Sequence, residues 1–483
     1  MAAVTDDQKQ QFYAKVMIAS DQFIRRCEAL DDLIDSILPV VETHDSLDRG
    51  AAELVSALRF VPLEDRVRFS QFWVEYMTNS GDHIEFSEML GAIFEEFKSE
   101  SYLPKLIAAM HDLLLRPKRK KLMLEQFVIS AVSSFEVLFA ALVKEFYKVS
   151  PQALENVARE TEKEFSLKDL KALENIEDAV DLAITRRIDD LMFKSFSEWR
   201  KFFSDRTNIK FEECAIDWER LKEVFQRRHI LVHNGGIVSK RYISNVNSSL
   251  AGSLKAGDEV SCDEEYAHRA VAEVMAFGFL LSSSLLLKFG KDFAEWTASR
   301  ANDFAYSNLL AERNSVVGKV TEFVGTMNVP MGSKLTAKVN NWIARERMSP
   351  DSTRAEISSW DVSALGDRYR LAKLCLQGEK HEALKLVKVL YRAGELSAED
   401  IIEWPLFEPF QKSAEYKELL TGVELPVDLN WSQHATSLLV NKKTGVVHLD
   451  SCRLKSGSWV PVPFREASKY RRCKTCGPIA LAK

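Results

Sequence analysis

The sequence predicts a mainly α, multi-domain protein that ends in a small α+β module. Three observations lead to this prediction. Apolar residues recur at helical spacing over long stretches, notably 122–148 and 263–289. The chain has 483 residues, which is too long for a domain with a single hydrophobic core, so about three domains are expected. A strand-like hairpin pattern is found near the C-terminus, around residues 437–449.

The composition is that of an ordinary soluble globular protein, with 46% hydrophobic and 28% charged residues. With a net charge of −6, the chain as a whole has no electrostatic attraction to nucleic acid. The seven cysteines do not form a disulfide framework, which indicates a reducing compartment. Residues 1–15 are polar, and the apolar stretch 275–287 is shorter than the ~20 residues that span a bilayer. We therefore expect a cytoplasmic protein with no membrane partner.

We divide the chain into four domains. Residues 1–105 form an N-terminal helical domain without a chemical constellation, and 106–292 form a helical bundle. Residues 293–432 form a helical linker or interaction domain, in which 371–376 and 382–390 predict a helical hairpin. Residues 433–483 form the C-terminal module.

The bundle is predicted to have four main helices. Their apolar periodicity places them at about 122–148, 176–203, 217–233 and 263–289. The third carries Trp218, Leu221, Val224, Phe225 and Val232 at helical spacing, so that these residues should face the core. The Ser-, Asn- and Gly-containing stretch between the third and fourth helices predicts a loop.

The end of the third helix carries the residues with the clearest chemistry, in the run Arg228-His229-Ile230-Leu231-Val232-His233-Asn234-Gly235-Gly236. At about 100° per residue, His229 and His233 lie about 40° apart on one face, whereas Arg228 and His233 diverge by about 140°. Arg228 and His233 converge only if the last turn loosens, which the Gly pair favours, or if a second copy contributes. Histidine can donate or accept a proton at neutral pH, and arginine binds phosphate.

In this run Arg228 and His233 fit an Arg-x4-His pattern that resembles the HEPN superfamily of helical domains. The placement near the end of the third helix and the trailing Asn-Gly-Gly agree with that resemblance, which covers about residues 119–290. It implies a homodimer and a metal-independent endoribonuclease, in which Arg228 binds the phosphate, His233 is the main acid/base and His229 assists. It also implies cyclic-phosphate products, a role in antiviral defence or as a toxin, and an inhibitory or antitoxin partner. Attack by a 2′-OH specifies RNA as the substrate.

Other interpretations of the same residues stay open. His229 and His233 can bind a metal as an i, i+4 pair, although the sequence shows no third ligand nearby. Arg228 can pair with a carboxylate while the histidines cap the helix; Glu136, on the first bundle helix, is polar in an apolar stretch and is a candidate to face the same cleft. The alternative function is a non-catalytic HEPN-type module that binds nucleotide, RNA or protein. A signalling scaffold whose cavity senses a small ligand is a third.

The C-terminal module contains a metal-ligand pattern, His448-x3-Cys452 followed after twenty residues by Cys473-x2-Cys476. Two close pairs of N/S ligands separated by a short loop suit a tetrahedral zinc site, and four protein ligands leave no open position. We therefore expect structural zinc at this site and no metal for catalysis. The hairpin pattern places His448 on its second strand.

The module resembles a short His-Cys-Cys-Cys zinc module appended to nucleases and other nucleic-acid proteins, with Phe464, Tyr470 and Pro478 in matching places. Residues 441–483 contain ten Lys or Arg and two acidic residues. A compact basic module on an acidic body indicates contact with a polyanion, for which RNA is the expected partner.

Overall fold

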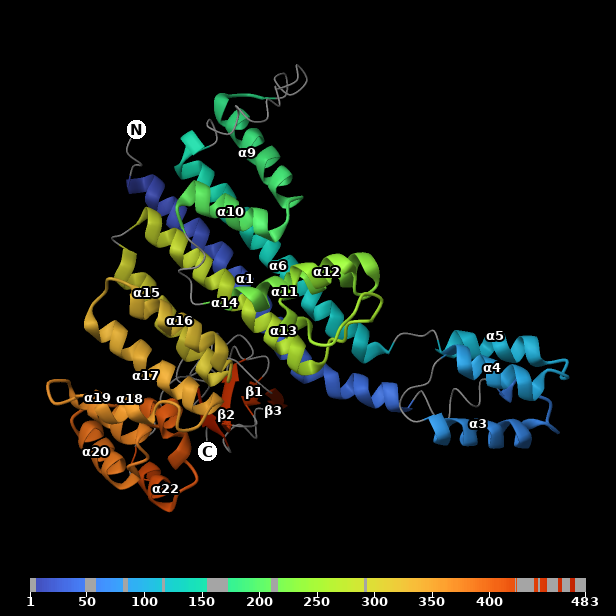
Figure 1. Ribbon diagram of the computed structural model, residues 1–483. Coiled ribbons are helices and arrows are strands. Elements are labelled where there is room, and N and C mark those ends of the chain that lie inside the picture. The colour runs from blue at the N-terminus through green and yellow to red at the C-terminus, as the bar shows by residue number, and fades with distance from the viewer. Residues whose placement is uncertain are drawn as a thin grey trace. The chain divides into compact units, whose positions relative to one another are not determined.

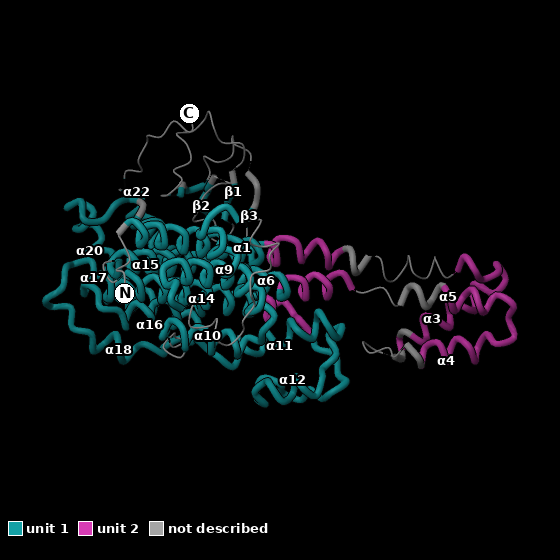
Figure 2. Tube along the Cα trace, turned by 90° about the horizontal axis from the view of Figure 1, so that it is seen from above, with its two compact units in different colours: residues 1–32, 128–260, 268–483 teal, residues 33–127, 261–267 magenta. Residues whose placement is uncertain are grey.

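The computed structural model describes residues 6–47, 58–80, 86–114, 118–153, 173–209, 216–290, 293–421, 423, 438–441, 444–449, 459–462 and 470–473. Within these ranges the protein is mainly helical, as the sequence predicts, with four short strands (Figure 1). The residues fall into two compact units, which Figure 2 colours separately. Unit 1 comprises residues 1–32, 128–260 and 268–483, and unit 2 comprises 33–127 and 261–267.

This division differs from the four domains that we expected. The first 32 residues group with the bundle, not with a separate N-terminal domain, and the bundle shares one unit with the region 293–432. The reason is that Phe12, Phe23 and Cys27 on the first helix are buried. The Phe12 and Phe23 rings pack against aromatic rings of unit 1.

The helices that carry the bundle are α1 (Asp6–Leu47), α6 (Arg119–Val149), α9 (Ile176–Met192), α10 (Phe196–Thr207), α11 (Trp218–Asn234), α12 (Lys240–Asn245), α13 (Ser248–Ala251) and α14 (Glu264–Phe289). Three of them, α6, α11 and α14, lie close to the ranges predicted from apolar periodicity. The ranges predicted for the second helix and for the loop before the fourth need correction.

The predicted helix 176–203 is wrong, because it is two helices. After α9 ends at Met192, Ser195 starts α10 with a capping box, in which its hydroxyl accepts from the Glu198 N–H and the Glu198 carboxylate accepts from the Ser195 N–H. The predicted loop between α11 and α14 contains α12 and α13, both with side-chain N-caps.

The core of the bundle is aromatic. The Phe135 ring on α6 stacks on Phe277 of α14 at 4.8 Å between centroids, and Phe139 stacks on Trp199 of α10 at 4.7 Å. Phe225 on α11 meets Phe135 edge to face. Offset and edge-to-face pairs of this kind stabilise a core beyond the area that they bury. These contacts fix α11, which carries the candidate site, against α6 and α14.

Gly278 on α14 allows two other helices to come close. A Cβ atom at this position would overlap the Phe23 ring of α1 and would lie 2.9 Å from Leu138 Cδ2 of α6. Only a residue without a side chain fits there. The N-terminal part of α1 therefore belongs to the core of unit 1.

Unit 2 contains a small helical cluster of its own. It is built from α3 (Arg66–Ser80), α4 (Phe86–Phe97) and α5 (Leu103–Leu114). Phe69, Ile93, Phe97 and Leu106 are fully buried in it. Like the sequence, the described part of this cluster offers no catalytic constellation.

The second half of unit 1 continues as the helices α15 (Ala294–Leu310), α16 (Asn314–Thr326), α17 (Met331–Met348), α18 (Arg354–Ser359), α19 (Asp367–Leu376), α20 (Lys380–Arg392), α21 (Ala398–Glu403), η4 (Pro405–Phe410) and α22 (Ala414–Thr421). Helices α15, α16 and α17 pack side by side (Figure 1). Helices α19 and α20 form the predicted hairpin.

A four-stranded sheet, ordered β3-β1-β2-β4, stands near the C-terminus. Its strands are β1 (Leu438–Asn441), β2 (Val446–Leu449), β3 (Trp459–Val462) and β4 (Arg471–Arg472). Strands β1 and β2 form the predicted antiparallel hairpin, and β4 pairs with β2 in parallel. His448 lies on β2, as the pattern predicts.

By length and composition, two described helices, α6 and α14, are apolar enough to cross a membrane. In α14, 89% of the most apolar window is buried inside the protein, and in α6 the share is 50%. The core helices of soluble proteins pass the same test, so this finding is weak evidence for a membrane. The cytoplasmic location stays a prediction.

Candidate functional site at the end of α11

Helix α11 is positioned by its two ends and its buried face. Asp217 caps the N-terminus, where its carboxylate accepts from the Arg220 N–H. Leu221, Phe225 and Ile230 are buried and hold the helix in the bundle. Val232 is 46% exposed, so its predicted place in the core is wrong. It lies three residues from His229, on the side of the helix that faces solvent.

The last turn of α11 closes on a glycine. Gly235 has φ 60°, in the left-handed region, and the N–H groups of Gly235 and Gly236 both donate to the Ile230 carbonyl. The Gly235 bond spans five residues instead of the four of a regular turn, so the helix widens where it ends. Backbone groups therefore cap this end, and it does not need a histidine to do so.

His229 and His233 are both exposed and face each other. Their ring centroids are 4.7 Å apart and the ring planes meet at 51°. Among the described residues, no hydrogen bond or ion pair joins Arg228 directly to His233. The charges of both residues act on the pKa of His229, which precedes His233 by one helical turn. The helix end therefore presents two adjacent imidazoles to solvent with a guanidinium beside them.

Arg228 is held from a second helix. Its Nη2 donates to Glu136 Oε2 on α6 at 3.0 Å, and the two side chains are 24% and 26% exposed. Burial raises the pKa of Glu136, and Arg228 acts against that shift. The Nε atom of Arg228 is buried and has no hydrogen-bond partner among the residues that the structure describes. The Glu136 contact orients the guanidinium, yet it also occupies part of the surface with which Arg228 would bind a phosphate.

A second cation that sequence reasoning missed lies at this site. Partial burial, followed by the charges of His233, Arg241 and Arg228, lowers the pKa of His229 below its usual value. Arg241 is an exposed residue of the short helix α12. The sequence predicts a loop between α11 and α14, and a loop has no regular spacing from which the position of Arg241 could be derived. For this reason the sequence did not place Arg241 near the histidines. A depressed pKa keeps the His229 imidazole neutral at pH 7.

Helix α12 is tied to α11 by a buried polar network. Glu223 Oε1 accepts from Arg227 Nε and from the Tyr242 hydroxyl, each at 2.7 Å. Burial and the Glu223 charge raise the pKa of Tyr242, so the hydroxyl keeps its proton and donates. Asn245 adds a weaker bond to Gln226 at 3.5 Å. This network fixes the position from which Arg241 acts on His229.

The structure bears on the open interpretations of these residues. Arg228 does pair with a carboxylate, as the structural interpretation of the motif requires, while the helix end is capped by backbone groups. In the part of the chain that the structure describes, the one cluster of three or more metal-ligand side chains does not include His229 or His233.

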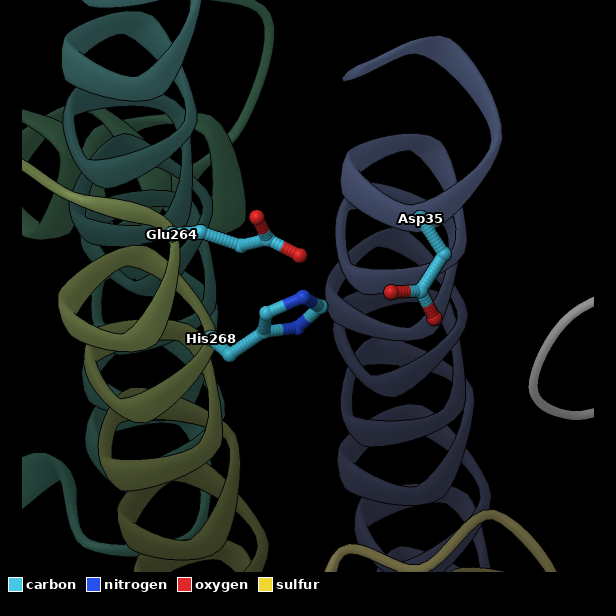
Figure 3. A group of neighbouring side chains, drawn as sticks. All are labelled: Asp35, Glu264 and His268. Atoms are coloured by element: carbon cyan, nitrogen blue, oxygen red, sulfur yellow. The ribbon is translucent and has the colours of Figure 1, made fainter. Parts of the chain in front are cut away.

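That cluster consists of Asp35, Glu264 and His268. Figure 3 shows Asp35 on α1 and the other two residues on α14. Asp35 and Glu264 belong to unit 2 and His268 to unit 1, so we assign no site to them. Within unit 1, His268 Nδ1 already lies 2.6 Å from Asp31 Oδ1, and Asp31 Oδ2 accepts from Arg313.

The predicted zinc ligands are described in part. His448 is 6% exposed and Cys473 is 1% exposed. Because Val447 pairs with Arg472 and the Cys473 N–H donates to the Val447 carbonyl, the next position along the two parallel strands sets Cys473 beside His448. Cys452 and Cys476 lie outside the described residues. An imidazole and a thiol buried on neighbouring strands fit two ligands of a zinc site, in which they would hold the metal and join the strands.

Comparison of the chain with protein-family models, with curated proteins and with solved structures found no match.

Proposed function

We propose that this protein is a metal-independent endoribonuclease whose active site is the end of α11. The observation that carries the proposal is the exposed His229 and His233 pair, with ring centroids 4.7 Å apart, next to the guanidinium of Arg228. Two imidazoles supply a base and an acid, and the guanidinium stabilises negative charge. These are the functions that RNA cleavage by its own 2′-OH requires.

In the proposed reaction a ribose 2′-oxygen attacks the adjacent phosphorus atom and the 5′-oxygen leaves. One imidazole takes the 2′-OH proton and the other gives a proton to the 5′-oxygen, so the products are a 2′,3′-cyclic phosphate and a 5′-OH. The lowered pKa of His229 suits the proton acceptor, because its ring is neutral at pH 7. His233 remains the principal acid/base residue, and Arg228 binds the scissile phosphate.

Arg241 adds a second positive charge at the same helix end and supports the choice of a polyanionic substrate. An exposed guanidinium next to a catalytic group binds a phosphate in the adjoining nucleotide without specifying a base. We place it in the site as a substrate-positioning residue, which acts alongside Arg228.

The test is an RNA cleavage assay in EDTA with the wild type and the variants His233→Ala, Arg228→Ala and His229→Ala. His381→Ala, at an exposed histidine on α20, is the matched control. We expect cyclic-phosphate products from the wild type and the control, and none from His233→Ala or Arg228→Ala. Equal degradation by all preparations would assign the activity to a contaminant and reject the proposal. Circular dichroism checks that chelation leaves the helices folded.

A second candidate function is a non-catalytic HEPN-type module that binds nucleotide, RNA or protein. The Glu136 and Arg228 ion pair favours it, since the carboxylate occupies one side of the guanidinium. In that case RNA would bind and be recovered intact, and His233→Ala would bind it as tightly as the wild type. Fluorescence anisotropy with labelled RNA, followed by gel analysis of the same sample, separates the two functions.

The C-terminal module is proposed to bind structural zinc through His448, Cys452, Cys473 and Cys476 and to hold RNA through its basic residues. Support comes from the buried pair of His448 and Cys473 and from the surplus of Lys and Arg in residues 441–483. A homodimer, a setting in defence or as a toxin, and an inhibitory partner follow from the HEPN resemblance alone.

A further inference from the structure

A cleft of about 820 Å³ lies in unit 1, and neither His229 nor His233 lines it. Helix α1 contributes one wall through Met17, Ile24 and Glu28, and the remaining walls come from α14, α15, α17, α19 and α21 with the residue that follows it. The volume suits a small organic ligand, for which pockets of about 300–1,000 Å³ are usual.

The cleft has two kinds of lining. Aromatic rings form much of its apolar surface: Phe279, Trp296, Phe304, Tyr306, Tyr369 and Trp404. Five carboxylate side chains and three guanidinium side chains also line it: Asp21, Glu28, Asp303, Asp400 and Glu403, with Arg25, Arg300 and Arg368. The carboxylates exceed the guanidinium groups, so the cleft carries net negative charge.

Two of the guanidinium groups are already engaged. Arg300 Nη2 donates to Asp21 at 2.6 Å, and its Cζ lies 4.8 Å from the centre of the Phe279 ring. Arg368 lies 3.7 Å from an Asp400 oxygen, with its Cζ 5.6 Å from the centre of the Trp404 ring. These contacts show that the walls accept a cation over an aromatic ring. They also leave little positive charge to attract an anion.

Glu28 is the carboxylate of the cleft that lacks a direct partner in the described part of the chain. Among the described residues it has no hydrogen bond and no ion pair within 4.0 Å. Burial raises its pKa to about 7. The charged groups that face it are Arg313 and Arg25, which lower the pKa, and Asp32 and Asp21, which raise it. A strongly shifted carboxyl group in a cleft is typical of a functional site, because a bound ligand can supply the missing partner.

We propose that this cleft binds a small organic cation, an amine or guanidine compound whose charge pairs with Glu28 and whose body packs on the aromatic walls. A positive charge of this kind would favour the ionised form of Glu28 and would also lie over the aromatic rings. The carboxylate and the aromatic parts of the lining therefore both contribute to binding. A phosphate or carboxylate ligand would meet the surplus of negative charge. The proposal is independent of the ribonuclease activity.

The experiment is isothermal titration of the full chain, without RNA, with spermidine and with agmatine, and with ATP as the anionic probe. At pH 7.5 we expect one molecule of spermidine or agmatine to bind per chain, and ATP not to bind in the cleft. Glu28→Gln should weaken binding at least about tenfold, since one paired charge is worth at least that much when desolvated. Glu382→Gln, an exposed position on α20 with the same loss of charge, should bind as the wild type.

Two further measurements test the same site independently of Glu28→Gln. Trp296 is 45% exposed at the cleft, so Trp296→Ala should fold and should weaken binding about threefold to tenfold through the lost aromatic contact. Binding should also weaken as the pH falls from 7.5 to 5.5, because Glu28 becomes protonated. Absence of binding by both cations, or equal affinity of Glu28→Gln and the wild type for them, would each overturn the proposal.

Discussion

Histidines occupy two contrasting settings in unit 1. At the end of α11, His229 and His233 are exposed, face each other and are surrounded by arginines. In the small sheet, His448 is 6% exposed, lies beside Cys473 and meets the Trp459 ring edge to face at 4.8 Å. The contrast teaches that burial and neighbours, not residue type, decide the chemistry. Solvent access suits proton transfer, whereas a buried imidazole beside a thiol suits a metal.

The largest expected effect separates the two settings by activity. His233→Ala should lower RNA cleavage by about 10²–10⁴-fold, the usual range for removing a general acid or base. It should leave the zinc content unchanged. Cleavage rates and metal analysis on the same preparation test the expected loss of cleavage and the expected retention of zinc. A variant that cleaves normally would mean that the exposed imidazoles are not the catalytic pair.

The converse change concerns the sheet. His448→Ala should lower bound zinc from roughly one per chain to a small fraction, because a tetrahedral site loses one of its four ligands. Cleavage of a short RNA by the α11 site should stay within about threefold of the wild type. Full zinc retention, measured by metal analysis after gel filtration, contradicts the assignment of His448 as a ligand. His381→Ala again serves as the control.

A third prediction compares Arg227 and Arg228, two successive arginines of α11 that pair with different carboxylates. Glu223→Gln breaks a pair whose side chains are only 7% and 10% exposed, and should lower the free energy of unfolding by about 3 kcal/mol. Glu136→Gln breaks the more exposed pair with Arg228, whose side chains are 24% and 26% exposed, and should cost less than about 1 kcal/mol. Urea unfolding curves measure both. Equal losses would show that Arg228 is as structural as Arg227.

The smallest effect is a pH shift. His229 has a pKa below its usual 6.5, because burial and the neighbouring cations disfavour its charged form. The unfolded chain therefore binds the extra proton more readily, so this residue lowers the stability as the pH falls below about 6.5 and has no effect above it. Arg241→Ala should move the His229 pKa upward, toward its usual value, as measured by NMR titration. A pKa that does not move would remove Arg241 from the site.

Sequence periodicity predicted the helices that bury an apolar face, such as α6 and α14, because a regular spacing of apolar residues is itself the cause of the burial. It missed the break before Ser195, where a capping box interrupts an otherwise continuous apolar pattern. It also missed that the first 32 residues join unit 1. That packing depends on which surfaces are complementary, a property that no single stretch of sequence contains.

At the candidate site, local spacing placed His229 and His233 on one face, since the helical rotation fixes that relation. The sequence singled out Glu136 without assigning it a partner, and the 3.0 Å contact with Arg228 joins residues 92 positions apart. Arg241 was not found at all. Its position depends on α12 and on the buried bonds from Tyr242 and Arg227 to Glu223.

The close approach at Gly278 has a consequence for the order in which the molecule is made. Phe23 leaves the ribosome long before its partner surface exists, because Gly278 follows 255 residues later in the chain. At a synthesis rate of about 10 residues per second, the Phe23 ring waits about 25 s for this contact. The packing of α1 against α14 is thus completed late in synthesis, and until then this part of the Phe23 ring is open to a chaperone.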